Sequence, residues 1–234
     1  MSRPKMTDAH RQRIRGQIMD RAYEILIEKG LESISSRAIA QHLDLTHMGL
    51  FTYFPNQAAI LQALAEREQQ KLLEKLQPYK QRAQHEDIAL VLKGMLVQFQ
   101  QFATEKPNLY QLIWIEPEVN IPPHWMQPTI DLVAGLIRIG VDKSVFDVND
   151  AQRASILVLS LVNMPFMLSA CGKISRDESL DQLSQEALET AMNYLLIKTV
   201  SGVPARPETS KIQPAWVRQT ASTVRRFINR LLKH

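Results

Sequence analysis

The chain has 234 residues and 45% of them are hydrophobic, which is enough for a sizeable core in one or two domains. Glycine is scarce, with 8 residues, and alternating runs of Val, Thr and Ile are rare, so the composition favours an all-α fold. The single cysteine, Cys171, excludes an intramolecular disulfide and indicates a reducing cytoplasmic location, and no signal peptide is expected.

The net charge of +4 is distributed unevenly. Residues 1–82 carry +4, residues 83–201 carry −6 and residues 202–234 carry +6. A basic end and an acidic middle are typical of a protein that presents one end to a polyanion. The N-terminal cations can lie along phosphates, although a solvated tail is an equal alternative for the first two: Arg3, Lys5, Arg11, Arg13 and Arg15.

The first helix is expected over residues 8–29, because apolar residues recur on one face and Gly30 can end the helix. Ser35 then caps a short helix whose apolar side contains Ile39, Ala40 and Leu43. A turn is expected at residues 44–45.

Thr46 caps a second short helix, which buries Leu50, Phe51 and Phe54. Its outer face carries His47, Met48, Gly49, Thr52 and Tyr53. Such a short helix needs clamping by its neighbours, and its small, hydrogen-bonding outer face suits a DNA major groove.

One long amphipathic helix is expected over residues 55–82, as the mechanical link to a second domain. Further helices are predicted at residues 86–105, 109–115, 125–139, 147–173 and 177–200, with Pro-rich loops at 116–123 and 202–214. Residues 215–233 are predicted to form a basic amphipathic helix, which docks on an acidic surface or, less favoured, lies on a membrane.

Residues 154–172 are uncharged over 19 positions, nearly a membrane-spanning length. Ser155, Ser160, Asn163 and Pro165 argue against insertion, so we expect a buried helix and no membrane partner.

The run Leu45-Thr46-His47, the run Leu50 to Asn56 and the pairs Ile39-Ala40 and Ile60-Leu61 resemble the TetR family of bacterial transcriptional regulators. The resemblance extends back to residue 14 and covers roughly the first quarter of the chain. It implies an all-α protein with an N-terminal three-helix DNA-binding domain containing a helix-turn-helix, followed by a larger helical ligand-binding and dimerisation domain. The expected divisions are residues 1–54, 55–82, 83–201 and 202–234.

Two positions depart from the family pattern. Asp44 stands in the turn where the family usually has glycine, and it tolerates the left-handed conformation less well. Gln57 stands where the family usually has a phosphate-binding lysine; it can donate a hydrogen bond to DNA but supplies no charge.

The resemblance implies DNA contacts from both motif helices. At the first, hydroxyls, backbone N–H groups and Arg37 meet phosphate or a guanine edge, although Arg37 can instead be a solvated surface residue. Gly49 permits close approach to the groove or reflects marginal local stability. The predicted DNA-binding residues are Ser35, Ser36, Arg37, Thr46, His47, Met48, Gly49, Thr52, Tyr53 and Gln57.

The second domain is rich in aromatic and Met residues, which suit a pocket for a hydrophobic or planar ligand but also suit an ordinary helical core. Asn163 is the best single candidate, because Pro165 frees a carbonyl and opens the helix beside it. The predicted ligand-binding residues are Phe99, Phe102, Tyr110, Trp114, Trp125, Asn163, Met164 and Met167.

The sequence shows no catalytic constellation, no metal-ligand spacing among its histidines and no glycine-rich phosphate loop, so neither an enzyme nor a cofactor is predicted. The favoured function is a repressor that binds a palindromic operator in double-stranded DNA as a homodimer and is released by a small effector. The family resemblance implies a four-helix dimer interface, for which residues 150–172 and 178–200 are the expected helices. The alternatives are an activator or constitutive DNA-binding protein without an effector, and a helical dimerisation module that has lost DNA binding.

Overall fold

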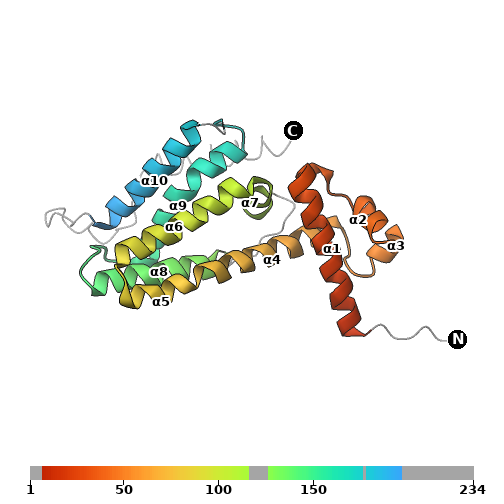
Figure 1. Cartoon of the computed structure of the whole chain (residues 1–234), viewed down its shortest axis with the longest axis horizontal. Coiled ribbons are helices and arrows are strands. Elements are labelled where there is room, and N and C mark those ends of the chain that lie inside the picture. Colours follow the sequence, from red (N-terminus) through yellow and green to blue (C-terminus); the bar gives the residue numbers. More distant parts are fainter. Residues whose placement is uncertain (1–6, 116–125, 176–177, 197–234) are drawn as a thin grey trace, which may run out of the picture. The chain divides into compact units, whose positions relative to one another are not determined.

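The computed structural model describes residues 7–115, 126–175 and 178–196 (Figure 1). This part of the chain is built from helices and contains no strand, which confirms the predicted all-α class. The helices are α1 (Asp8–Lys29), the 3₁₀ turn η1 (Leu31–Ser33), α2 (Ser36–His42), α3 (His47–Leu50), α4 (Gln57–Leu76), α5 (Pro78–His85), α6 (Ile88–Glu105), α7 (Pro107–Trp114), α8 (Gln127–Asp142), α9 (Ala151–Ala170) and α10 (Glu178–Leu196).

The N-terminal helices form the predicted helix-turn-helix domain around one hydrophobic core. α1 has the predicted bounds, and Gly30 ends it at a φ of 83°, a conformation that glycine adopts without strain. The core is made by apolar residues of α1, α2, α3 and the first half of α4: Ile18, Ala22, Ile25, Leu26, Ile39, Ala40, Leu50, Phe54, Ile60, Leu61 and Leu64.

This core also includes one face of α7, a helix that begins 50 positions further along the chain than α4. Leu109, Leu112 and Ile113 are fully buried and belong to the same cluster as the α1 and α4 side chains. The core of the DNA-binding domain therefore crosses the division expected at residue 83.

The second core lies among the ends of α4 and α5 and helices α6, α8, α9 and α10. α9 packs against both α8 and α10 (Figure 1). Gln100 of α6 adds a polar tie, because its Nε2 donates to the Ser184 carbonyl of α10 at 2.8 Å. These helices surround the cavities described below.

The predicted single helix over residues 55–82 is wrong. Asn56 caps α4, which ends at Leu76, and a new helix begins at Pro78. Proline lacks the N–H that an uninterrupted helix needs, and it is well suited to the first helical position. Gln77 keeps helical dihedrals and its N–H donates to the Leu73 carbonyl, so the backbone stays helical between α4 and α5.

The predicted bounds of α9 are too wide. Its N-cap is Asp150, whose side chain accepts from the Arg153 N–H, while the Asp147 N–H donates to the Leu195 carbonyl of α10. Within the described residues α9 is the one helix long and apolar enough to cross a membrane, with a mean hydropathy of 1.5. Its inner face is nonetheless packed into the second core, through residues such as Ala154, Val158 and Val162.

Several sequence predictions concern residues outside the described ranges. They are the cations Arg3 and Lys5, the loop at 116–123, Trp125, the end of the last core helix beyond Leu196, and the loop and basic helix of residues 202–234.

Gly140 generates a prediction about stability. A Cβ added there would lie 2.0 Å from the ring of Phe146, which is itself buried. We expect Gly140→Ala to lower the free energy of unfolding by about 1–3 kcal/mol, because a packed ring has nowhere to move. The melting temperature and urea unfolding would be measured.

Gly135 of the same helix is the matched control, since a Cβ there meets nothing within 4 Å. Gly135→Ala should keep or raise stability, because alanine favours a helix over glycine. Equal destabilisation by the two substitutions would contradict the packing described at Gly140.

Candidate DNA-binding surface and ligand cavity

The second motif helix, α3, is four residues long and is held by contacts at both ends. Thr46 caps it as predicted, its Oγ1 accepting from the Gly49 N–H at 2.9 Å. At the other end Arg15 of α1 donates to the Tyr53 carbonyl, and its guanidinium lies 3.9 Å from the centre of the Phe54 ring. Since so short a helix has little stability of its own, these contacts determine its orientation.

The turn between α2 and α3 forms where predicted. Asp44 has a φ of 52°, in the left-handed region that the family's usual glycine occupies more easily. The Leu45 N–H donates to the Ala40 carbonyl at 3.1 Å and closes the turn. The departure at Asp44 is therefore accommodated in the backbone.

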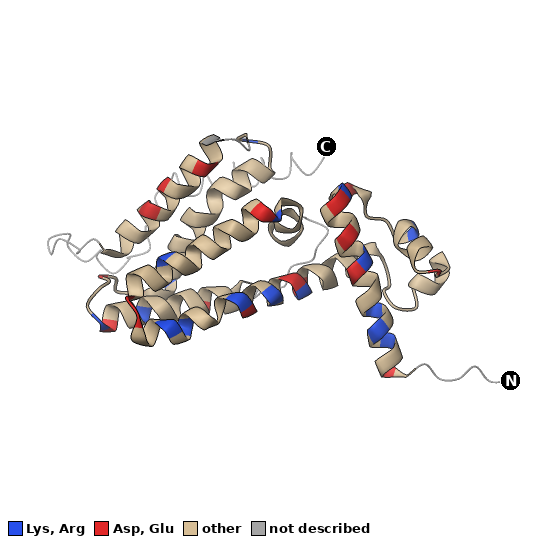
Figure 2. Ribbon diagram, viewed as in Figure 1, with Lys and Arg blue, Asp and Glu red and all other residues tan. Residues whose placement is uncertain are grey.

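Most of the predicted DNA-binding residues lie on the surface. Arg37 of α2 is exposed, and Met48 of α3 is 76% exposed, an unusual value for a large apolar side chain. Figure 2 shows basic positions along the first half of α1, in the same domain. The remaining exposed candidates are Thr46, His47 and Thr52, while Ser35, Gly49 and Tyr53 are partly buried.

Three side chains differ from expectation. Ser36 is only 8% exposed, so its hydroxyl does not face solvent. Phe51 is half-buried instead of fully buried, and its ring packs edge-to-face with His47 at 4.8 Å. Gln57 donates from Nε2 to the Ile34 carbonyl at 3.0 Å. Its amide thus joins the start of α4 to the loop before α2.

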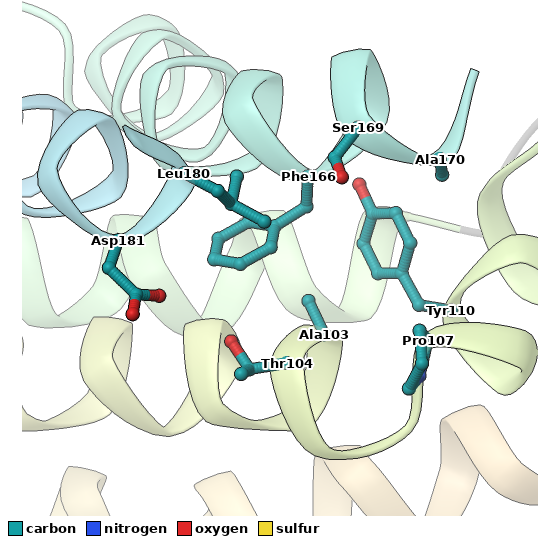
Figure 3. A pocket seen from close by; sticks show the side chains of 9 residues that line it. All are labelled: Ala103, Thr104, Pro107, Tyr110, Phe166, Ser169, Ala170, Leu180 and Asp181. Carbon is teal, nitrogen blue, oxygen red and sulfur yellow. The ribbon is translucent and has the colours of Figure 1, made fainter. Parts of the chain in front are cut away.

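A cavity of about 320 Å³ lies between α6, α7, α9 and α10 (Figure 3). Its inner wall contains Tyr110 of α7 and Phe166 and Ser169 of α9. Thr104 and Asp181, both exposed, lie at its open side. The remaining lining residues are Ala103, Pro107, Ala170 and Leu180.

A second cavity, of about 190 Å³, lies near the first, and one hydrogen bond joins the walls of the two. The Tyr110 hydroxyl donates to Asn163 Oδ1 at 2.6 Å, and Asn163 lines the second cavity with Phe99. Burial raises the pKa of Tyr110, so the phenol stays neutral and keeps its donor. The Tyr110–Asn163 pair is therefore a wall between the two spaces.

Trp114 supports Tyr110 from behind. The two rings stack with centroids 5.0 Å apart and planes 22° apart, and Phe99 and Phe102 approach Trp114 edge-on. The predicted aromatic residues that the structure describes thus form one connected group, which fixes the position of the Tyr110 ring.

One predicted ligand residue lies apart from this group. Met164 is 50% exposed and lines a separate groove of about 300 Å³ between α9 and α10. Trp125 is outside the described residues. Met167 is partly buried and packs near Tyr110 and Phe166.

The sequence prediction missed Ser169 and Asp181 as lining residues. Ser169 offered a signal, because a hydroxyl four residues after Pro165 in an apolar helix needs a partner. Asp181 offered none, because an exposed carboxylate on an amphipathic helix is commonplace.

Polar contacts join α7 and its N-terminal flank to α1. Asn108 Nδ2 donates to the Leu26 carbonyl at 3.0 Å, and the Lys106 ammonium donates to the Tyr23 hydroxyl at 3.2 Å. On the α4 side, Arg67 pairs with Asp20 at 2.6 Å. The two domains are therefore joined by oriented hydrogen bonds as well as by apolar packing.

The fold and the exposed helix-turn-helix define a DNA-binding protein with a second, cavity-bearing helical domain. Residues 18–64 match the family model described as bacterial regulatory proteins, tetR family. The chain thus carries the DNA-binding domain of the TetR family, as the sequence resemblance implied, and the family's members are transcriptional regulators. A sequence search of curated proteins finds no match.

Solved structures share the fold over most of this chain. FadR from Thermus thermophilus, a TetR-family transcriptional repressor in complex with lauroyl-CoA, has a TM-score of 0.58 at 18% identity, covering 82% of this chain and 98% of its own. FadR from Bacillus subtilis, bound to stearoyl-CoA, has a TM-score of 0.59 at 17% identity, covering 77% of this chain and 98% of its own. RolR, bound to resorcinol, has a TM-score of 0.61 at 16% identity, covering 80% of this chain and 95% of its own.

Arg15 generates a prediction that separates structural from DNA-contacting cations. Arg15→Met should lower the free energy of unfolding by about 1–2 kcal/mol, because it removes a charged donor and a cation–π contact. The matched control is Arg13→Met, since Arg13 is exposed and bonds only its neighbour His10. Melting temperatures would be compared, and equal values for the two variants would contradict the clamping role.

Proposed function

We propose that this protein is a cytoplasmic transcriptional repressor that binds a palindromic operator as a homodimer and is released by a small hydrophobic or aromatic effector. The observation that carries the proposal is the position of α7, which has one face in the core of the DNA-binding domain and the other in the wall of the ligand cavity.

The two faces follow from the helical period. Leu109, Leu112 and Ile113 are spaced to lie together, and Tyr110 and Trp114, four residues apart, lie on another side. An effector that displaces the Tyr110 ring moves a helix whose other face is fully buried against α1 and α4. Packed cores resist small deformations, so such a movement shifts the DNA-binding domain as a unit.

The Asn108 and Lys106 contacts determine which part of the DNA-binding domain a movement of α7 reaches first. Both residues lie at the start of α7 and bond to α1, close to the end that Gly30 terminates. A rotation of α7 therefore pulls on the last turns of α1 and not on the exposed recognition helix directly. The effector acts by favouring a dimer whose two DNA-binding domains are wrongly spaced for the operator. This requires that the effector bind the two dimer arrangements with different affinities.

The cavity size supports a compact effector. A volume of about 320 Å³ is at the small end of ligand pockets and suits a molecule of one or two rings. The resorcinol bound by RolR is of this size, whereas the acyl-CoA bound by the two FadR proteins is far larger. We therefore propose a small ring compound over an acyl-CoA.

The outer surfaces of α9 and α10 support the proposed homodimer. α9 exposes Leu157 and Met164 at 44% and 50%, and α10 exposes Leu183 and Leu196 at 37% and 44%. Large apolar side chains gathered on two adjacent helices are typical of a protein interface. Two such helix pairs meeting about a twofold axis would form a four-helix interface.

Arg37 provides a test of DNA recognition. Sequences selected from random DNA by the full-length protein should contain a palindrome, because a twofold dimer reads two half-sites. Against the selected operator, Arg37→Ala should weaken binding by roughly tenfold or more in a gel-shift titration, since a guanidinium contact to a base edge or phosphate is lost.

Lys93→Ala on α6 is the charge-matched control, because Lys93 is exposed and belongs to the second domain. It should leave operator affinity unchanged. If selection returns no preferred sequence and Arg37→Ala binds as well as the wild type, the regulator function fails and a helical dimerisation module remains.

Met164 provides a test of the dimer. Met164→Glu should convert the dimer to monomer at micromolar concentration, because a buried carboxylate in an apolar interface has no partner. Light scattering after size exclusion would measure the mass. Leu90→Glu, at a 70% exposed site on α6, is the control and should leave the dimer intact; equal masses for the two variants would place the interface elsewhere.

A further inference from the structure

The inner wall of the 320 Å³ cavity holds a hydroxyl without a partner. Ser169 is 9% exposed, and its buried Oγ has no hydrogen-bond partner among the described residues. Figure 3 shows this side chain pointing from α9 toward the side of the cavity occupied by Tyr110. A buried polar group is rarely left unpaired, so this atom is the natural anchor for a polar atom of a ligand.

Beside the anchor, the wall is aromatic. The rings of Phe166 and Tyr110 are 5% and 1% exposed, with centroids 6.2 Å apart and planes tilted by 60°. Ala103 and Leu180 complete the apolar surface around them. This part of the cavity fits a flat ring, which gains contact area and edge or face interactions with both aromatic side chains.

The open side of the cavity is acidic. Asp181 of α10 is exposed and forms no ion pair with any described residue, and no Lys or Arg occurs among the described lining residues. Between residues 178 and 196 the sequence has four acidic residues and no basic one. Figure 2 shows acidic positions along α10. The potential at the opening therefore attracts cations and repels anions.

We infer that this cavity binds a small aromatic amine in its cationic form. The ring lies against Phe166 and Tyr110, a polar atom of the ligand pairs with the Ser169 hydroxyl, and the ammonium group faces Asp181. The inference rests on the effector-responsive function proposed above and narrows its ligand to one charge class.

Three probes with the same 4-hydroxyphenyl group separate charge from shape: tyramine is cationic, 4-ethylphenol is neutral and 3-(4-hydroxyphenyl)propionate is anionic. Their dissociation constants would be measured by calorimetry on the full-length protein without DNA. We expect tyramine to bind about twofold to fivefold more tightly than 4-ethylphenol, the range for one solvent-exposed charge pair, and the propionate to bind most weakly.

Three variants assign the effects to residues. Asp181→Asn should bring tyramine and 4-ethylphenol to equal affinity and leave 4-ethylphenol itself unchanged. Glu189→Gln, an exposed carboxylate on the same helix outside the cavity lining, is the control and should keep the preference. Ser169→Ala should weaken all three probes by roughly twofold to tenfold without lowering the melting temperature, because the hydroxyl it removes has no partner in the free protein.

Binding of the propionate as tightly as tyramine, absence of binding by all three probes, or a tyramine preference that survives Asp181→Asn would each overturn the inference. Since no DNA is present, the result is independent of repression. A preference that depends on Asp181, combined with no operator release by tyramine, would support the inference and contradict the proposed function.

Discussion

The sharing of α7 between the core of the DNA-binding domain and the wall of the ligand cavity is the constraint on which the rest of the molecule depends. Leu109, Leu112 and Ile113 complete the core of the DNA-binding domain, while Tyr110 completes the wall of a cavity in the other domain. The helix has eight residues, so neither face can move without the other. The Tyr110–Asn163 hydrogen bond fixes its position in the free protein and joins a residue that lines one cavity to a residue that lines the other.

The DNA-binding domain is stabilised by two side chains whose residue type would suggest a contact with DNA instead. Arg15 and Gln57 both suit phosphate binding by residue type, yet Arg15 clamps the end of α3 and Gln57 ties α4 to the loop before α2. The chain thus uses Gln57, in place of the family's lysine, for internal order. The exposed residues that remain for the proposed DNA contact are Arg37 and those on the outer side of α3, so the proposal relies on base reading and α1 cations more than on contacts from α4.

Local signals in the sequence predicted the DNA-binding domain well, because caps and turns are decided by neighbouring residues. Thr46, Ser35 and Gly30 act as predicted. The second domain was predicted less well, because its features depend on packing between distant segments. No local pattern distinguishes an apolar face buried in its own domain from one buried in another, so the role of α7 and the outward position of Met164 required the structure. Pro78 signalled a break in the helix, but the long amphipathic pattern around it was given more weight in the prediction.

Amide hydrogen exchange in the wild type and in Tyr110→Phe tests the coupling through α7 most directly. The substitution removes the hydroxyl that bonds Asn163 and keeps the ring, so its first effect is confined to the cavity wall. If α7 joins the two cores, exchange should become faster in α7 and also in residues 18–29 of α1, which share its buried face. Faster exchange in α7 and α9 with α1 unchanged would contradict the account.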